Sequence, residues 1–412
     1  MVSTLILYTV LLPMYPLDAT DVYDNIVRGR MGAVYGLNPF LDVPNQISHD
    51  PFYPFIGWPH VPSAYGAAWE LMAAGVARLA GDDYLTNVIA FKVLASLGSG
   101  LTILGLFLLL QKVQPTRALE GVYLFALNPL VAYHIAGRGH NDAWMIGFAV
   151  LGLAFYARKW YIAATMALLF GALIKFIPLI LIPVVAIRAW RFRAWLWRVR
   201  YCLGSAILGS ALIFVCYAPY WHGFDTLPTE RRARLYTGSI PTVLRQLLSP
   251  IFDGTTITAS VNETPHTNRF LANSTLLIFA IFYGWILWRE WHSTADDSAY
   301  QSATLILMGY LLIATLWFMA WYVIWPLATA VVLPDRPVRR IVLIFSYLVT
   351  WQSLLYRYVT LRDDGWAALP WRDGIPVASY MLVIWLVIAL YALQALRMTR
   401  KNTRHVSKHS SH

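Results

Sequence analysis

The chain has 412 residues, of which 58% are hydrophobic and only 13% are charged. Soluble domains are about half apolar and about a quarter charged, so this composition excludes an ordinary soluble protein and indicates a membrane protein. The net charge of +11 does not point to a nucleic-acid partner, because the basic residues lie in short turns between apolar runs and in the segment 397–412. That is the positive-inside pattern of a protein whose partners are membrane lipids.

Apolar runs long enough to cross a hydrocarbon layer of ~30 Å recur along the whole chain. We predict one all-α polytopic membrane domain over residues 1–412, with about twelve transmembrane helices and a range of roughly ten to thirteen. Residues 161–187 and 304–333 contain internal prolines and are predicted to be pairs of short helices. Clear single spans are predicted at 1–17, 87–111, 118–135, 142–157, 201–220, 270–288, 341–357 and 377–396.

The positive charges set the topology, because each added span moves every later turn to the opposite side. If residues 61–80 lie on the membrane surface, both ends of the chain and most Lys- and Arg-rich turns are cytoplasmic at the cell membrane. The basic segment 397–412 is then a cytoplasmic tail. Two helices lying on the membrane are predicted at 21–35 and 63–80. The extracytoplasmic segments are then 18–86, expected to be the catalytic loop, 136–142, the second long loop 221–269, and 358–376.

Three aspartates, Asp18, Asp21 and Asp24, recur every three residues directly after the first apolar run. On a helix they share one face, and close carboxylates repel, which raises at least one pKa and produces either a general base or a cation site. Alternatively, Asp18 only caps the helix. A divalent cation at the three aspartates is left open, because their spacing does not guarantee enough oxygen ligands.

Basic and aromatic residues supply candidates for binding a phosphate and a sugar. Arg28 and Arg30 could hold phosphate by paired hydrogen bonds or lie among lipid headgroups. Arginines of the 221–269 loop leave the same two alternatives. Trp321 and Tyr322 could stack on a sugar or belong to an interfacial aromatic belt.

Charged residues at helix interruptions are stronger candidates. Arg138, His140 and Asp142 stand together between two apolar runs, which exceeds what a polar turn needs, although Asp142 could simply cap the next helix. Lys175 lies in an apolar stretch, where an isolated lysine costs roughly 2.5–3.5 kcal/mol on insertion scales. A break in the helix there would let Lys175 reach water and an anion.

Taken in order, these motifs resemble the bacterial GT-C superfamily of membrane glycosyltransferases, which includes the polyprenol-phosphate-mannose-dependent mannosyltransferases. The family's first loop carries Asp-x-Tyr, Gly-Arg and Gly-x-Asn-Pro-Tyr. This chain departs from the family where Tyr65-Gly66-Ala67 replaces Tyr-Pro-Pro and where Val27-Arg28-Gly29-Arg30 replaces Trp-Asp-Gly-Arg. The matching stretches are Asp21-Val-Tyr-Asp-Asn, Arg30, Gly36-Leu-Asn-Pro-Phe40, Pro62-Ser-Ala-Tyr65-Gly66, Leu127-Asn128-Pro129, Gly139-His-Asn-Asp142, Lys175 before Pro178, and Ala320-Trp-Tyr322 before Pro326.

The resemblance implies an inverting transfer of a sugar, mannose being expected, from a polyprenyl-phosphate donor to a glycan or glycolipid acceptor at an extracytoplasmic site. It implies that Asp21 is the general base. Because the leaving group is a phosphate oxygen, cations rather than a proton are expected to stabilise it. The expected cations are Lys175, Arg138 and His140, with Arg28 and Arg30 in reserve. Further predicted substrate-binding residues are Asp24, Tyr65, Asp142, Trp321 and Tyr322.

Three other functions stay open, one of them that of a non-catalytic assembly subunit. A secondary transporter or lipid flippase would also use broken helices with charged residues, but its charges would spread toward both faces. A polymerase or ligase acting on lipid-diphosphate glycans would rely on the arginines of the 221–269 loop. The gathering of charged motifs on one predicted face favours the transferase.

Overall fold

The computed structural model describes residues 2–16, 20–191, 193–226, 235–256, 259–295 and 297–361, with side chains up to 351. These residues form helices joined by turns, with two isolated β-bridges and no β-strand among them. The all-α prediction is therefore confirmed over this part of the chain. The predicted span 377–396, the tail 397–412, most of 358–376 and Asp18 lie outside the described residues.

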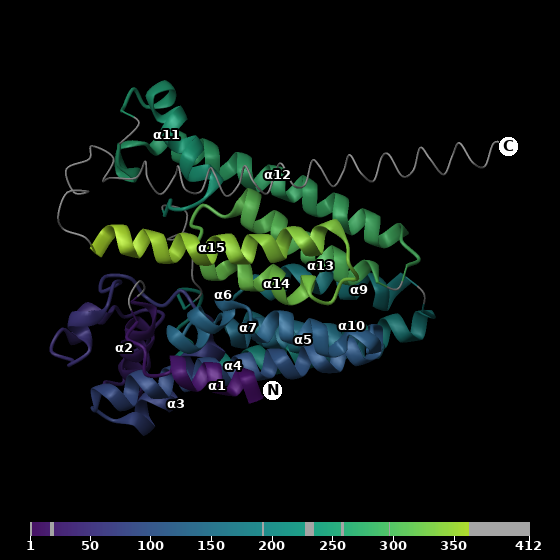
Figure 1. Cartoon of the computed structure of the whole chain (residues 1–412), viewed down its shortest axis with the longest axis horizontal. Helices are drawn as coiled ribbons and strands as arrows, with labels where there is room; N and C mark the ends of the chain where they lie inside the picture. The colour runs from purple at the N-terminus through teal and green to yellow at the C-terminus, as the bar shows by residue number, and fades with distance from the viewer. Residues whose placement is uncertain are drawn as a thin grey trace.

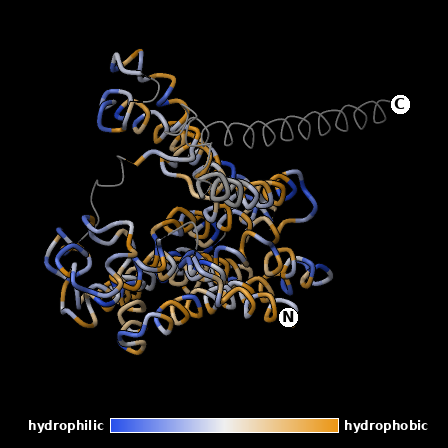
Figure 2. The backbone as a smooth tube through the Cα atoms, turned by 60° about the vertical axis from the view of Figure 1, so that its left-hand side comes forward, coloured by the Kyte–Doolittle hydropathy of each residue, from blue (hydrophilic) through white to orange (hydrophobic). Residues whose placement is uncertain are grey.

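Three of the described helices are long and apolar enough to cross a membrane, judged by length and composition. They are α4 (Tyr84–Val113), α10 (Trp195–Tyr217, extended by a turn to Tyr220) and α12 (Pro265–His292). In Figure 2 such long helices are largely hydrophobic, while hydrophilic stretches gather in the turns and loops. These helices support a membrane protein, and the twelve-span topology stays a prediction. Shorter apolar helices are α1 (Val2–Leu11), α7 (Asp142–Ala157), α8 (Tyr161–Ala172) and the stretch Ser298–Ala314.

One stretch predicted to be a single span, 118–135, is interrupted. Helix α5 (Ala118–Ala126) ends before Asn128, and a short helix α6 (Pro129–Val131) leads into a π-helical turn at Ala132–Gly137. The Asn128 side chain accepts a hydrogen bond from the Leu130 amide at 3.0 Å and donates one to Ser346 of α15 (Pro337–Leu361) at 2.9 Å. Asn128 thus caps the new helix and fastens it to α15.

The two proline-containing stretches form pairs of short helices, as predicted. Helix α8 ends before Lys175, and a 3₁₀ turn at Ile177–Leu181 leads into α9 (Ile182–Arg191). The second pair is α13 (Ser298–Gly309) and α14 (Ile324–Ala330), which pack against each other. Both breaks supply residues to the site described below.

The first long loop carries two helices, α2 (Asp21–Ala33) and α3 (Ala67–Ala80), whose bounds are close to those predicted from the sequence, 21–35 and 63–80. Between them lie 3₁₀ turns at Pro44–Ile47 and Tyr53–Phe55. The two helices approach closely because Gly29 has no side chain: a Cβ there would lie 2.5 Å from the Ala73 carbonyl oxygen. Both helices lie toward the left-hand side of Figure 1.

The second long loop carries α11 (Ile240–Phe252), which lies toward the same side of Figure 1. The two loops predicted to share a face therefore lie toward one end of the helices.

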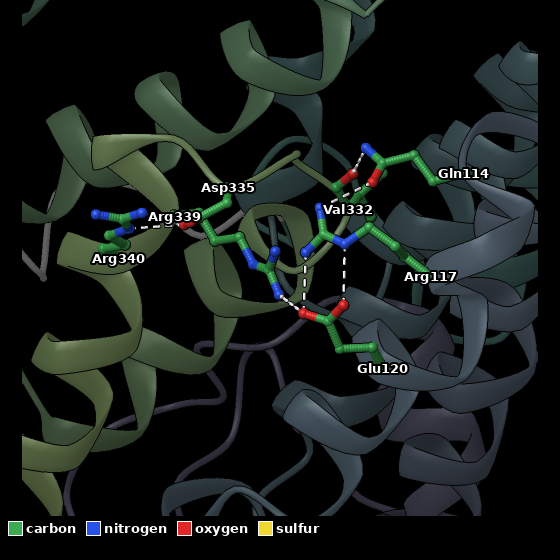
Figure 3. Close-up of polar contacts among 7 residues, drawn as sticks. All are labelled: Gln114, Arg117, Glu120, Val332, Asp335, Arg339 and Arg340. Carbon is green, nitrogen blue, oxygen red and sulfur yellow. Dashed lines mark hydrogen bonds and ion pairs between the residues drawn. The ribbon is translucent and has the colours of Figure 1, made fainter. Parts of the chain in front are cut away.

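At the opposite end, acidic residues in the predicted cytoplasmic turns are paired with arginines. Arg117 binds Glu120 at 2.9 Å, Arg339 of α15 reaches the same carboxylate, and Arg340 pairs with Asp335, as Figure 3 shows. Such pairing explains why these turns carry acidic residues within a positive-inside pattern. Two further pairs in these turns are Arg188–Glu290 and Arg336–Asp297.

Candidate active site

Helix α2 presents Asp21 and Asp24 in different surroundings. Asp24 accepts hydrogen bonds from the Thr20 hydroxyl at 2.8 Å and from the amides of Gly57 and Trp58 at 3.2 and 3.1 Å. Its side chain is 4% exposed, whereas that of Asp21 is 22% exposed. Asp24 therefore fixes the loop at Gly57, and Asp21 is the more exposed of the two carboxylates.

The polar turn after the π-helical stretch brings His140 to Asp21. Gly139 adopts a left-handed conformation with φ of +76°, which a side chain would strain. The imidazole Nδ1 lies 3.3 Å from Oδ2 of Asp21. The His140 ring is stacked on Trp321 with centroids 3.9 Å apart, so the break between α13 and α14 also lines this contact.

Lys175 lies in the break after α8, as predicted, and binds a buried carboxylate. Its Nζ donates to Oδ1 of Asp142 at 2.8 Å, and the indole nitrogen of Trp325 donates to the same oxygen at 2.6 Å. Three aromatic rings surround the ammonium group at 4.9 to 5.8 Å, which favours a cation there. They belong to Tyr65, Tyr322 and Trp325.

The charges of this cluster act on Asp21. Burial by itself would raise the pKa of Asp21, but the His140 hydrogen bond and the positive charges of Lys175 and Arg28 outweigh it and hold the pKa below its ordinary value. Burial raises the pKa of Asp24 against the opposing effect of Arg28. The pKa values of the two carboxyls are thus shifted in opposite directions, that of Asp21 downward and that of Asp24 upward.

Gly66 joins the first loop to the Lys175 break. Its amide donates to the Ile174 carbonyl at 2.9 Å, and the Ala68 amide donates to Leu173 at the same distance. A Cβ at Gly66 would lie 2.1 Å from the Leu173 carbonyl oxygen. The departure from the family's Tyr-Pro-Pro therefore has a structural reason, since proline has no amide hydrogen to donate.

Two predicted arginines have other partners. Arg30 binds Asp50 at 2.7 Å and Asp82 at 2.8 Å, which holds the first loop together. Arg28 donates to the Val61 carbonyl at 2.9 Å and still acts electrostatically on Asp21. Arg30 is the predicted site residue that the structure places apart from the cluster.

The remaining predicted cation, Arg138, is 1% exposed. It donates to the Tyr133 hydroxyl at 2.8 Å and stands two residues before His140. In the second long loop, Arg245 is buried and donates to the Ala259 carbonyl at 2.9 Å. Arg245 thus stabilises its own loop.

A metal site among the aspartates finds no further support. Over the described part of the chain, no group of three His, Cys, Asp or Glu side chains could hold a metal ion. Asp18, the third aspartate of the motif, is outside that part.

Three residues of this region were not identified from the sequence. Trp325 follows Tyr322 by one helical turn, which could have indicated a shared face. The ring of His134 lies 5.5 Å from that of His140. Lys92 lies in an apolar stretch of sequence, as Lys175 does, so the same argument about the cost of an isolated lysine could have found it.

The comparisons with known proteins concern mannosyltransferases. Residues 1–191 match the family model described as "Alpha-(1->6)-mannopyranosyltransferase, N-terminal domain". The chain is 24% identical over 170 residues to Alpha-(1->6)-mannopyranosyltransferase A of Corynebacterium glutamicum, which covers 38% of this chain and 32% of that protein. It is 27% identical over 143 residues to Alpha-(1->6)-mannopyranosyltransferase B of the same organism, covering 34% and 23%.

A longer match is found with Alpha-(1->6)-mannopyranosyltransferase A of Mycobacterium tuberculosis. The two chains are 23% identical over 400 residues, which covers 94% of this chain and 74% of that protein. The matches to the two Corynebacterium glutamicum proteins, in contrast, span less than a third of their length. The resemblance to bacterial mannosyltransferases is confirmed: residues 1–191 match the N-terminal domain of the alpha-(1→6)-mannopyranosyltransferase family, and the similar proteins named above are alpha-(1→6)-mannopyranosyltransferases.

Proposed function

We propose that this protein is an inverting mannosyltransferase that moves mannose from a polyprenyl phosphate to a glycan or glycolipid acceptor on the extracytoplasmic side of the cell membrane. The observation that carries the proposal is the contact of Asp21, from the first loop, with His140, whose ring stacks on Trp321 from one helix break, while Lys175 in a second break acts electrostatically on the same carboxylate. A partly exposed carboxylate thus lies within the electrostatic influence of a buried ammonium group.

Asp21 is the general base of the proposed reaction. Its carboxylate is exposed enough to meet an acceptor hydroxyl, and its lowered pKa keeps it ionised. Asp142 is 1% exposed and already binds Lys175, so it is a counter-charge rather than a base. A positioned base of this kind typically contributes about 10²–10⁴ in rate.

Lys175 is the leading candidate to hold the phosphate of the donor. An ammonium group has three hydrogens, and Asp142 accepts one of them at 2.8 Å. The aromatic rings around it exclude water and strengthen its interaction with an anion. Tyr322 and Trp325 stack with centroids 4.4 Å apart and form an apolar surface beside the ammonium group.

The test is a transfer assay on the purified full chain, with polyprenyl-phosphate mannose and a mixed glycan-lipid acceptor pool. Wild type should transfer label, and Asp21→Asn should lose at least about 10²-fold in kcat because the base is gone while the shape is kept. Unchanged thermal unfolding in detergent is the control for folding. Wild-type-like turnover in Asp21→Asn would contradict the assignment of the base. No transfer by wild type from this donor would contradict the proposed function.

A further inference from the structure

His140 lies behind Asp21 rather than beside a phosphate. It was expected to be one of the cations for the donor, yet its side chain is only 1% exposed, against 22% for Asp21. Its Nδ1 faces the Asp21 carboxylate at 3.3 Å. A substrate that reaches Asp21 therefore meets the carboxylate first and the imidazole only through it.

The imidazole is held in one orientation. Trp321 is nearly parallel to the ring, with 21° between the planes and 3.9 Å between the centroids. The ring of His134 closes another side at 5.5 Å, and the His140 amide donates to the His134 carbonyl at 3.2 Å. Nε2 is buried without a hydrogen-bond partner among the described residues. Within that part of the chain, the contact with Asp21 is the polar interaction of this ring.

We propose that His140 is a positioning residue for the reaction proposed above: its Nδ1–H donates to Oδ2 of Asp21 and aims Oδ1 at the acceptor hydroxyl. In the transfer, the acceptor oxygen bonds to C1 of the sugar while the bond from C1 to the phosphate oxygen breaks. The hydroxyl proton passes to Oδ1, and the electron pair of the broken bond stays on the phosphate. His140 neither gains nor loses a proton in this step.

Other charged groups face the same carboxylate and set the background for any pH effect. Lys175, in the break after α8, interacts electrostatically with Asp21, as do Arg28 and Asp24 on α2. Tyr65, just before α3, does so too. His134 faces His140 from the π-helical turn. These groups stay in place when His140 alone is replaced, so a shift in the pH profile reports the loss of its hydrogen bond.

The experiment compares His140→Ala with His140→Asn in the full chain, using polyprenyl-phosphate mannose as the donor. The Asn amide can donate from nearly the position of Nδ1, but it does not titrate. For the Ala variant we expect kcat about 10²-fold lower with an unchanged donor KM, because a small displacement of the base is costly. The acid limb of kcat/KM should move to higher pH, since the hydrogen bond that lowers the pKa of Asp21 is lost. The Asn variant should recover most of kcat and return the acid limb toward its wild-type position.

Two results would overturn this inference. One is a raised donor KM with unchanged kcat in His140→Ala, which would mean that the imidazole binds the phosphate. The other is an Asn variant as impaired as Ala with no movement of the acid limb, which would mean that the ring only fills space. If wild type transfers label, Asp21→Asn does not, and both His140 variants behave as wild type, this inference alone fails. If wild type is inactive, the proposed function fails and this inference fails with it.

Discussion

At the scale of single residues, one buried charge near the site is held in a pair, so substituting it also changes the state of its partner. Lys175 and Asp142 form this pair, with 9% and 1% of their side chains exposed. A paired carboxylate that loses its cation is left uncompensated in a medium that solvates it poorly. The loss of the Lys175 ammonium group must therefore be separated from the cost of leaving Asp142 buried without a cation.

Lys175→Met should destabilise the protein by about 3–5 kcal/mol, because Asp142 stays buried without its cation. The matched control is the double variant Lys175→Met with Asp142→Asn, whose amide oxygen can still accept from Trp325. Thermal unfolding in detergent should show the midpoint largely restored in the double variant. Transfer should stay absent, since no ammonium group is left for the phosphate. Recovered transfer in the double variant would show that Lys175 is only structural.

The residues of the cluster could be predicted from sequence, but their pairings could not. Asp21, His140 and Lys175 were identified because charge in or beside apolar stretches is costly and needs a reason. Which carboxylate Lys175 would bind depends on a contact between residues 33 positions apart, which no local pattern encodes. Arg30 was predicted to bind phosphate on the same grounds as Arg28, yet its guanidinium group forms ion pairs with Asp50 and Asp82.

At the scale of elements, close backbone approaches decide how the first loop meets the helix breaks. The start of α3 lies against the Leu173 carbonyl, and the neighbouring Tyr65 ring reaches Lys175 at 5.8 Å. Local sequence predicted the helix and the break separately. It did not predict that they join, because the contact needs only a missing Cβ and two amide hydrogens.

Gly66→Ala should weaken this junction, since the added Cβ would lie 2.1 Å from the Leu173 carbonyl oxygen. We expect a loss of about 1–3 kcal/mol from overpacking and a lower rate of transfer as Tyr65 moves away from Lys175. Gly75→Ala is the matched control, because a Cβ at Gly75 meets nothing within 4 Å and alanine favours the helix by about 1 kcal/mol. Thermal unfolding and transfer assays on both variants test this. Equal behaviour of the two would contradict the proposed junction.

In helix α11, polar side chains are buried and apolar side chains are exposed, the reverse of a helix on the surface of a soluble protein. Arg245 and Ser249 face inward and are buried, while Leu247 and Ile251 are 61% and 73% exposed. The ring of Phe252 packs at a tilt against that of Phe270 near the start of α12, with centroids 5.0 Å apart. An outward apolar face that continues into a membrane-length helix is suited to the acyl-chain boundary rather than to water.

We therefore expect a cysteine at Leu247 to be shielded by lipid. In a Cys202→Ser, Cys216→Ala background, Leu247→Cys should react slowly with a membrane-impermeant maleimide, and a fluorophore placed there should be quenched by spin-labelled lipids. Asn262→Cys, at an exposed polar position, should react quickly and resist this quenching. Equal reactivity at the two positions would show that α11 lies in water.

At the scale of the whole molecule, one end carries the candidate active site and the opposite end carries ion pairs between helices. The pairs differ in burial: Glu290, bound by Arg188 at 2.6 Å, is 0% exposed, whereas Asp335, bound by Arg340, is 57% exposed. Exposed pairs contribute little to stability, and buried ones are costly to break. The long apolar helices were predictable from sequence because length and composition define them. The breaks at Asn128 and the pairing of these charges depend on neighbours distant in the chain.

Glu290→Gln should destabilise the protein by about 3–5 kcal/mol, because it removes the carboxylate that neutralises buried Arg188. Asp335→Asn, at the same end of the molecule, removes only the exposed pair with Arg340 and should cost no more than about 1 kcal/mol. Thermal unfolding midpoints of both variants in one detergent provide the measurement, and transfer activity should follow folded protein alone. Similar midpoints for the two variants would argue against a difference set by burial.

Lys92, in the first third of α4, donates to the carbonyl oxygens of Leu11, Leu12 and Met14 at no more than 3.2 Å. The last turn of α1 thus receives its cap from a lysine about eighty positions later in the chain. During synthesis, α1 emerges long before that lysine exists, so the last turn of α1 stays without this cap until α4 has been made. The final arrangement of α1 consequently has an order in time: it follows the synthesis of α4 and cannot precede it.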